Sequence, residues 1–369
     1  MTARVPSPPA APDTLSGGRP PRRGRAVRAV RTPGGLLSVR VESRTALVLL
    51  LLLAAALLAG VVVIGSGDYP MSPGTVLTTL TGGGSPAQEF IVRDLRLPRA
   101  LVGLLVGACL GIGGAVFQSV TRNPLGSPDV IGFGQGASVG ALSAIILLHG
   151  GAAQTALGAV VGGLVTGAAI YLLAWKRGVH GYRLVLVGVG AAAMLTAVTQ
   201  YLITKADLVD ATRAVLWMTG TLDGAAWSQV WPLLVLCAVL VPLTLSGGRR
   251  LRMMEMGDDA AYALGVPVQR TRILLMACAV LLVGAATAAA GPITFVSLSA
   301  PQLARRLTRA PGPNLAASAA MGALLLCVAD LLATRAFGDR QLPAGVVTAV
   351  VGGVYLLWLL VTERRAGRI

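Results

Sequence analysis

Residues 117–137 read FQSVTRNPLGSPDVIGFGQGA, and this stretch decides how the chain is folded. An apolar run leads into it, and a second apolar run leaves it and continues to about Leu148. Asn123, Pro124 and Pro128 lie between the two runs, and proline lacks a backbone donor and does not continue a helix. The stretch therefore predicts two apolar helices joined by a short polar turn.

Along the rest of the chain, uncharged apolar runs also alternate with short polar connections. The 369 residues are 54% hydrophobic and 12% charged, whereas about 25% of a soluble protein is charged. The uncharged runs cover residues 46–64, 100–121, 130–148, 150–175, 184–204, 225–248, 273–304, 314–329 and 342–362. A spanning helix needs roughly 20 apolar residues, so we divide the longest run at Gly291–Pro292. We predict an all-α integral membrane bundle of about ten transmembrane helices, because no soluble core of this size could bury so many runs.

Basic residues are distributed unevenly between the two sides of such a bundle. If the N-terminus is cytoplasmic and the helices alternate, 24 of the 31 lysines and arginines fall on the cytoplasmic side and 7 fall outside. This is the positive-inside bias, so both termini are predicted to be cytoplasmic. The net charge of +16 therefore reflects membrane orientation and does not indicate nucleic-acid binding.

The sequence divides into a basic N-terminal segment, residues 1–44, and a membrane domain, residues 45–365. The segment is rich in arginine, proline and glycine, so we expect it to be disordered and cytoplasmic. Anchoring the topology is its simplest role, and contact with anionic membrane lipid is a second one. A cleaved signal peptide fits poorly, because the first apolar run lies far from the start.

The sequence lacks the motifs of a chain that carries out its own chemistry. ATP hydrolysis requires G-x-x-x-x-G-K-[ST], and neither Lys176 nor Lys205 fits that pattern. The four cysteines fall inside predicted spans and there are only two histidines, so we expect no metal site, cofactor or catalytic residue. Asp330, near the end of the ninth span, is either a functional intramembrane acid or a structural residue that caps the helix end or pairs with Arg335. We expect a non-enzymatic protein whose energy, if it transports, comes from another chain.

Glycines recur at intervals of four residues inside the predicted spans. In a membrane, small residues at this spacing allow two helix backbones to approach closely. The pattern predicts a compact helical bundle and says nothing about a cargo. The sets are Gly103, Gly107 and Gly111; Gly132, Gly136 and Gly140; Gly158 and Gly162; and Gly163 and Gly167.

One stretch after the sixth span is too short and too polar to cross a membrane. Asp258 and Asp259 provide the carboxylates that suit a helix N-terminus. Gly265 and Pro267 provide the signals that end a helix. We therefore predict a short helix near residues 256–266 on the cytoplasmic side, either a docking point for a partner or an ordinary surface helix.

Together these motifs resemble the iron–siderophore ABC permeases of the FecCD family, which also includes the vitamin B12 permease. The similarity runs from about residue 45 to 365, and is closest to the G-type subunits of ferric-enterobactin permeases. It is carried by RLPRALVGLLVGACLGIGGAVFQSVTRNPLGSPDVIGFGQGA (96–137), LWMTGTLDGAAW (216–227), EMGDDAAYALGVPVQRTRIL (255–274), AGPITFVSLSAPQLARRL (290–307) and the C-terminal block beginning ADLLATRAFGDRQLPAGVV (329–347).

The resemblance implies a permease subunit of an importer for ferric siderophore of the catecholate type, in the cytoplasmic membrane. Its implied partners are two ABC ATPase subunits, a second and related permease subunit in a heterodimer, and an extracytoplasmic siderophore-binding lipoprotein. Two alternatives stay open: a permease for another chelate such as vitamin B12 or haem, and a structural or sensory membrane bundle that imports nothing. The short cytoplasmic helix argues against the last.

The resemblance also implies roles for particular residues. The ATPase coupling helix would comprise Glu255, Gly257, Asp258, Asp259, Ala261, Leu264 and Gly265. Arg96, Arg99 and Arg335 would dock the binding protein by charge. The cytoplasmic gate would fall near Gly181 and Tyr182, where the match is weak. Asn123, Pro124, Pro128, Gly132 and Gly136 would shape a helix turn and its packing.

Overall fold

The computed structural model of the chain describes residues 27–31, 38–67, 69–129, 132–175, 181–336 and 342–365. The chain separates into two units, Met1–Ser43 and Arg44–Ile369.

The first unit contains a pair of antiparallel strands, β1 (Val27–Arg31) and β2 (Ser38–Glu42), in which Val27 lies opposite Glu42. Valines alternate with polar residues in SVRVE, which is the period of a strand. The prediction of disorder throughout residues 1–44 missed this pair. The rest of that segment, residues 1–26 and 32–37, lies outside the described residues.

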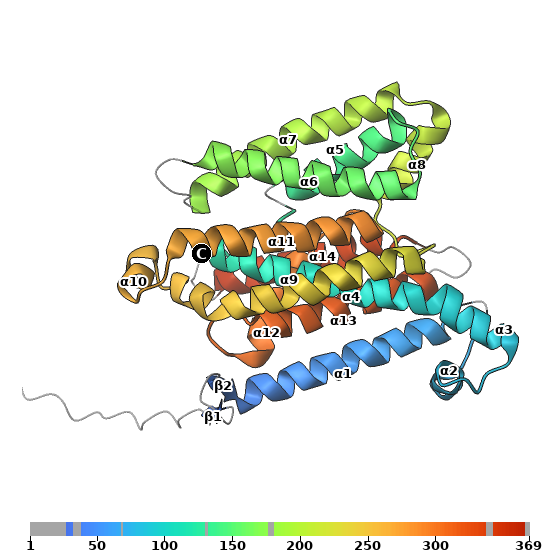
Figure 1. Cartoon of the computed structure of the whole chain (residues 1–369), viewed down its shortest axis with the longest axis horizontal. Helices are drawn as coiled ribbons and strands as arrows, with labels where there is room; N and C mark the ends of the chain where they lie inside the picture. Colours follow the sequence, from blue (N-terminus) through green and yellow to red (C-terminus); the bar gives the residue numbers. More distant parts are fainter. Residues whose placement is uncertain are drawn as a thin grey trace, which may run out of the picture. The chain divides into compact units, whose positions relative to one another are not determined.

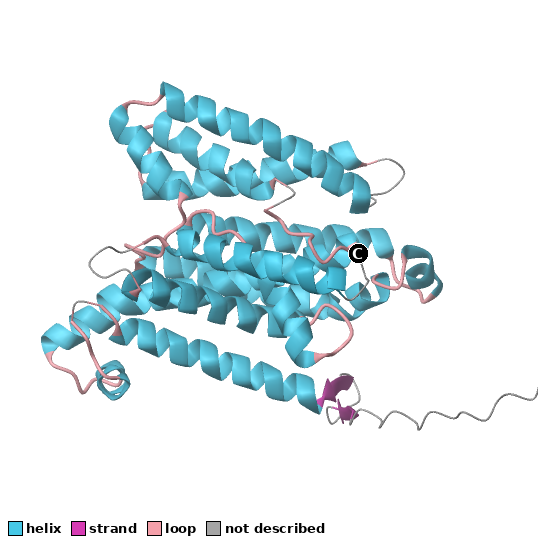
Figure 2. Cartoon of the chain, turned by 180° about the vertical axis from the view of Figure 1, so that it is seen from behind, coloured by secondary structure: helices cyan, strands magenta, loops and turns pink. Residues whose placement is uncertain are grey.

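The second unit is built of helices (Figures 1 and 2). In chain order they are α1 (Ser43–Gly65), α2 (Pro73–Leu80), α3 (Pro86–Glu89), the π-helix η1 (Phe90–Arg96), α4 (Leu97–Thr121), α5 (Phe133–Ile146), α6 (Ala152–Ala174), α7 (Gly181–Lys205), α8 (Leu208–Met218), α9 (Trp227–Met254), α10 (Asp258–Ala263), α11 (Val268–Ala290), α12 (Val296–Thr308), α13 (Leu315–Arg335) and α14 (Ala344–Arg365).

Seven of the described helices are long and apolar enough to cross a membrane, which confirms the predicted class of an all-helical membrane protein. They are α1, the continuous α3–η1–α4, α6, α7, α9, α11 and α13. The other three predicted spans correspond to α5, α14 and α12, which is only 13 residues long. The division at Gly291–Pro292 is confirmed, because α11 ends at Ala290 and Gly291 has a φ of 72°.

Helix α4 lies at the centre of this unit and packs against α9, α11, α12 and α13. In the apolar stretch of the continuous helix that contains α4, 78% of the residues are buried. The corresponding buried share is 22% for α6 and 17% for α7. The two less buried helices therefore present apolar side chains outward, as expected of helices in contact with hydrocarbon.

Glycines bring α4 into direct contact with the backbones of its neighbours. A Cβ on Gly107 would overlap the backbone of Gly322, and a Cβ on Gly111 would overlap the carbonyl of Ser318, both on α13. The α5–α6 pair is built in the same way, with Gly140 of α5 against Gly158 of α6. The close approach predicted from the glycine spacing is therefore confirmed for these pairs.

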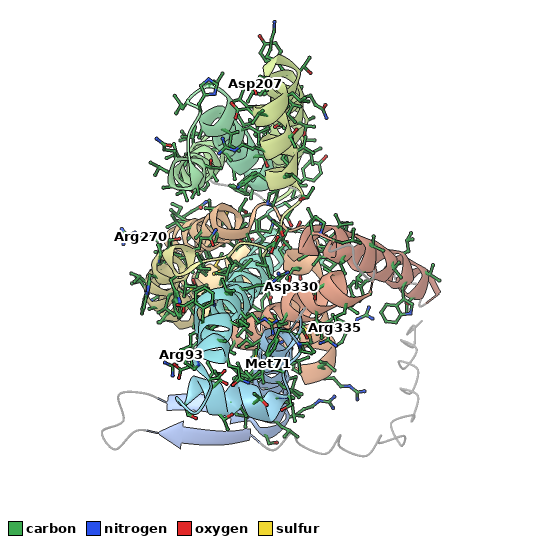
Figure 3. The ribbon with its side chains drawn as sticks, turned by 90° about the vertical axis from the view of Figure 1, so that its right-hand side faces the viewer. Met71, Arg93, Asp207, Arg270, Asp330 and Arg335 are labelled. Carbon is green, nitrogen blue, oxygen red and sulfur yellow. The ribbon has the colours of Figure 1, made fainter. Side chains whose placement is uncertain are left out.

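A buried ion pair also joins α4 to α13. Arg99 donates from Nε and Nη2 to the two carboxylate oxygens of Asp330, at 3.0 and 2.9 Å. The Asp330 side chain is 2% exposed, and a third contact reaches the exposed Asp223 at 3.4 Å. The predicted pairing of Asp330 with Arg335 is wrong, because Arg99 engages both carboxylate oxygens and Arg335 lies on the exposed surface of α13 (Figure 3). The acid therefore has a structural partner within the bundle.

The glycine contact predicts a position-specific cost. Gly111→Ala should destabilise the protein by about 1–3 kcal/mol, because an added Cβ overpacks a contact that has no room. Gly284→Ala on α11 is the matched control, because no atom lies within 4 Å of its would-be Cβ. Alanine favours a helix over glycine by about 1 kcal/mol, so the control should be neutral or stabilising. Thermal unfolding of the purified proteins in detergent measures both, and equal behaviour of the two would contradict the proposed contact.

The ion pair predicts non-additive effects. Asp330→Ala leaves Arg99 without its buried partner, and breaking such a pair costs about 3 kcal/mol. The double variant Arg99→Met with Asp330→Leu removes both charges and should be more stable than Asp330→Ala alone. Thermal unfolding is again the measurement. A double variant no more stable than Asp330→Ala would show that the two side chains do not act as a pair.

Candidate functional site

Helix α10 has the start and the end that its sequence predicts. Gly257 precedes it with a φ of 114°, and Asp258 and Asp259 occupy its first turn. At its end Gly265 has a φ of 79°, and its N–H donates to the carbonyl of Tyr262 at 2.9 Å. The N–H of Val266 donates to Ala261 at 3.0 Å, which completes a Schellman motif. The short helix is thus closed by hydrogen bonds at its C-terminal end.

The two faces of α10 have different neighbours. Ala261 is fully buried in a small apolar cluster with Met254, Val266 and Val268. Ala261 is therefore the member of the predicted coupling set whose side chain packs inward. The outward apolar side chains are those of Met256, Tyr262 and Leu264, which are 70%, 58% and 59% exposed. Of the predicted coupling residues, Asp259, Leu264 and Gly265 are exposed, and Leu264 is the large apolar one among them. Met256 and Tyr262 were not predicted from the sequence.

The carboxylate of Asp258 binds two arginines from other helices. Its Oδ1 accepts from Nη2 of Arg122, directly after α4, at 2.6 Å. Both of its oxygens accept from Nη2 of Arg272 on α11, at 2.9 Å. Asp258 therefore joins the first turn of α10 to the ends of α4 and α11.

Glu255, which caps the end of α9, makes a second connection of this kind. Its Oε1 accepts from the hydroxyl of Ser119 on α4 at 2.7 Å and from Nη2 of Arg305 on α12 at 3.3 Å. The same Arg305 nitrogen lies 3.2 Å from the Ser119 oxygen. These contacts bring three helices, α4, α9 and α12, together beside α10.

The sequence identified the acids of this network but not their partners. Asp258 was noted because its carboxylate suits a helix start, and Glu255 only because the family resemblance implies it, whereas Ser119, Arg272 and Arg305 carry no local signal. In the sequence, Arg122 is counted only as one of the 24 basic residues of the predicted cytoplasmic side. Ser119 and Glu255 are 136 residues apart in the chain, as are Arg122 and Asp258, so only the fold brings them together.

The α4–α5 connection forms the predicted turn. Arg122 ends α4 in the left-handed region with a φ of 51°. The Oδ1 of Asn123 accepts from the N–H of Leu125 at 2.9 Å, and its carbonyl accepts from Gly126 at 2.9 Å. Gly132 has a φ of 92° before α5, where a side chain would be strained.

Asp129 attaches this turn to α12. Its Oδ2 accepts a hydrogen bond from the hydroxyl of Ser297 at 2.6 Å. Burial raises the pKa of the Asp129 carboxyl to about 6, and the hydrogen bond from Ser297 opposes that rise. The carboxylate form still predominates at neutral pH and accepts the bond.

The predicted docking arginines lie in different environments. Arg99 is engaged by Asp330, and Nη1 of Arg96 donates to the carbonyl of Ile64 in α1 at 2.9 Å. These internal bonds do not support the docking role that the resemblance implies for Arg96 and Arg99. Arg335 is exposed, as is Arg93 (Figure 3), whose guanidinium donates to the carbonyl of Leu80 at 3.2 Å.

The predicted gate lies at the start of α7. Gly181 is the first residue of that helix, and the Tyr182 side chain is 82% exposed. Residues 176–180, which lead into the helix, lie outside the described residues. Gating by Gly181 and Tyr182 therefore stays a prediction.

A histidine and two aspartates meet at the α5–α6 connection, where the sequence predicted no metal site. Ligand atoms of His149, Asp207 and Asp210 lie within 4.8 Å of one another. Protein contacts already engage them: Asp210 lies 2.7 Å from His149 Nδ1 and 3.4 Å from Arg213, and Asp207 caps α8 by accepting from the Asp210 N–H. The cluster thus fastens α8 to the α5–α6 connection.

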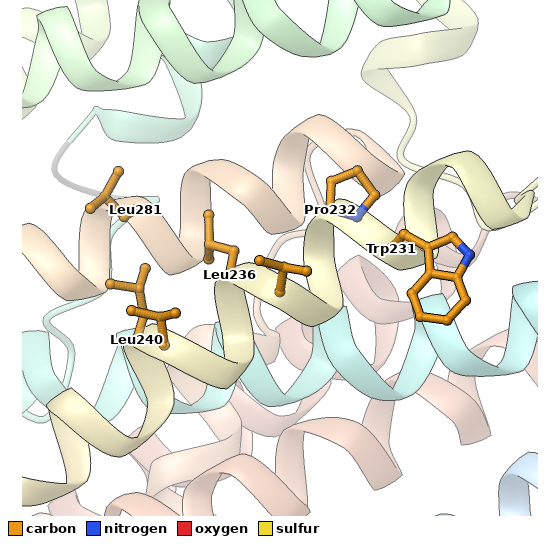
Figure 4. A pocket seen from close by; sticks show the side chains of 7 residues that line it. Trp231, Pro232, Leu236, Leu240 and Leu281 are labelled. Carbon is orange, nitrogen blue, oxygen red and sulfur yellow. The ribbon is translucent and has the colours of Figure 1, made fainter.

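An apolar groove runs along α9 and α11 (Figure 4). Its volume is about 530 Å³. Its lining is apolar, and Trp231, Val235 and Val239 are 58%, 62% and 63% exposed. Such a surface suits hydrocarbon, because it offers no polar group to orient a ligand. The lining residues are Trp231, Pro232, Val235, Leu236, Val239, Leu240 and Leu281.

Comparisons with known proteins agree with this architecture. The model of the FecCD transport family matches residues 47–362. The chain is 44% identical to the ferric enterobactin transport system permease protein FepG of Escherichia coli (strain K12), over 89% of this chain and 99% of FepG. It is 37% identical to the achromobactin transport system permease protein CbrC of Dickeya dadantii (strain 3937), over 82% of this chain and 88% of CbrC.

A solved structure gives the same result for the fold. An inward-facing metal-chelate-type ABC transporter superposes with a TM-score of 0.76 at 26% identity, covering 86% of this chain and 99% of that one. The family model covers nearly all of the membrane unit, and the relatives match it along almost their whole length. The chain therefore belongs to the FecCD transport family, whose members are permease subunits of ABC transporters.

Proposed function

We propose that this chain is the permease subunit of an ABC importer that carries a ferric siderophore of the catecholate type across the cytoplasmic membrane. The observation that carries the proposal is α10, a closed helix between α9 and α11 that presents Met256, Tyr262 and Leu264 outward. A membrane bundle without a partner has no need of a rigid apolar projection on a polar connection. The similarity to a ferric enterobactin permease over its whole length supports this choice of substrate class.

In this proposal ATP hydrolysis belongs to two separate ATPase subunits, each docking on one permease. The outward side chains of Met256, Tyr262 and Leu264 would fit an apolar groove on the ATPase. A few large side chains contribute most of the binding energy of a protein interface. On the opposite face of α10, the buried Ala261 packs against Met254, Val266 and Val268.

The remaining partners follow from the family and from the positive-inside bias. We propose ten spans with both termini cytoplasmic, a related second permease in a heterodimer, and an extracytoplasmic siderophore-binding lipoprotein. The orientation rests on 24 basic residues on the cytoplasmic side against 7 outside. Exposed Arg335 and Arg93 supply positive charge for the lipoprotein, which would act mainly on its association rate.

A cargo of another class is the nearest alternative, because related permeases are named for achromobactin, hydroxamate and citrate complexes of iron. A strain lacking this chain should lose uptake of ⁵⁵Fe-enterobactin and regain it when the gene is restored. Uptake of ⁵⁵Fe-ferrichrome, a hydroxamate complex, should be unchanged in the same strain. Loss of ferrichrome uptake with normal enterobactin uptake would overturn the catecholate assignment.

A substitution on the exposed face of α10 should weaken binding of the ATPase without affecting folding. Leu264→Arg should weaken co-purification of the ATPase by about 2 kcal/mol or more, roughly 30-fold, because an apolar anchor is replaced by a charge. Folding should be unaffected, since Leu264 is 59% exposed. Leu208→Arg on α8 is the control, because that leucine is 84% exposed and lies on the predicted outer side.

Co-purification from detergent extracts measures this effect, with thermal unfolding as the check on folding. Normal ATPase recovery with Leu264→Arg would show that α10 is only a surface helix. Ala261→Arg should instead unfold the α10 region, because Ala261 is fully buried.

A further inference from the structure

Helix α10 follows α9 and precedes α11 in the chain, yet its flanking carboxylates bind α4. Asp258 accepts from Arg122 at 2.6 Å, and Glu255 accepts from Ser119 at 2.7 Å. Ser119 lies in the last turn of α4, and Arg122 is the residue directly after that helix. The start of α10 is thus attached at two points to the same end of one helix.

That helix is the central one. Its glycines Gly107 and Gly111 lie directly on the backbone of α13, and Gly114 lies on the carbonyl of Ser297 at the start of α12. Close-packed interfaces of this kind transmit displacements, because they have no free space to absorb them. Any movement of α10 that keeps these bonds must also move α4.

We infer that Ser119 and Arg122 are positioning residues that transmit movement of the coupling helix to α4. The inference rests on the proposed function, in which an ATPase displaces α10. Arg272 and Arg305 hold the same two carboxylates to α11 and α12. The Arg272 side chain is 4% exposed, so it anchors Asp258 within the bundle. Arg122 is 44% exposed and adds a second, lateral connection.

Stability does not explain why an arginine is present at position 122. An ion pair between partly exposed side chains contributes little to folding. The backbone of Arg122 has a φ of 51°, a conformation that glycine adopts with less strain than arginine. A glycine would therefore suit the end of α4 better, and the arginine adds the contact to α10.

This strain permits a test in which folding and transmission respond in opposite directions. Arg122→Gly in the complete transporter should unfold at the wild-type temperature or above it, because the left-handed strain is relieved. Recovery of the ATPase and hydrolysis in the absence of binding protein should be unchanged. Stimulation of hydrolysis by the siderophore-binding protein loaded with ferric enterobactin should fall about 5-fold or more, as should ⁵⁵Fe-enterobactin uptake.

Two further variants give the test its controls. Arg122→Lys keeps a positive charge near Asp258 and should restore most of the stimulation, because Arg122 binds through a single nitrogen. Arg270→Ala removes an exposed arginine from the first turn of α11 (Figure 3) and should behave as wild type.

Ser119→Ala is a second test of the inference. It should lower the stimulation of hydrolysis, as Arg122→Gly does.

The inference is overturned if Arg122→Gly retains full stimulation. It is also overturned if Arg122→Gly loses the ATPase during purification, since Arg122 would then shape the docking surface and not transmit its movement. The proposed function fails separately, through a Leu264→Arg variant that still binds the ATPase normally.

Discussion

The structure depends on the close approach of α4 to the backbones of its neighbours. Gly107, Gly111 and Gly114 leave this helix with almost no side-chain layer on the faces that meet α12 and α13. Lipid tails are as apolar as leucine, so a membrane bundle gains its cohesion from packing and from polar contacts between helices. The central position of α4 follows from this arrangement, and so does its ability to form hydrogen bonds with α10, α12 and the α4–α5 turn at one end.

Polar side chains fasten the ends of this helix and leave its middle apolar. Arg99 pairs with Asp330 at the N-terminal end, and Arg122 pairs with Asp258 just beyond the C-terminal end. The two pairs differ in environment, since Asp330 is 2% exposed and Asp258 is 33% exposed. The pair at the N-terminal end is therefore a fixed structural link, whereas the one at the C-terminal end exchanges more readily with water.

Features that depend on local patterns were predictable from the sequence. The apolar runs gave the membrane class, the four-residue glycine spacing gave the packed faces, and Asp258 with Gly265 gave the limits of α10. Long-range pairings could not be predicted in this way, because nothing in the sequence near Asp330 indicates a partner 231 residues away. The inward orientation of Ala261 could not be predicted for a related reason, since a six-residue helix is too short for its inward face to show as a periodic pattern. The strand pair β1–β2 was hidden by a composition typical of disorder.

The separation of the two faces of α10 has an evolutionary consequence. Ala261 belongs to a small core with Met254, Val266 and Val268, whereas Tyr262 and Leu264 belong to no core within the part of the chain that the structure describes. Substitutions on the outward face are thus independent of folding, and they can accumulate without disturbing the membrane domain. A transporter built this way can diverge toward a new ATPase, or share one ATPase among several permeases, by changing a few surface side chains while its ancestral scaffold stays intact.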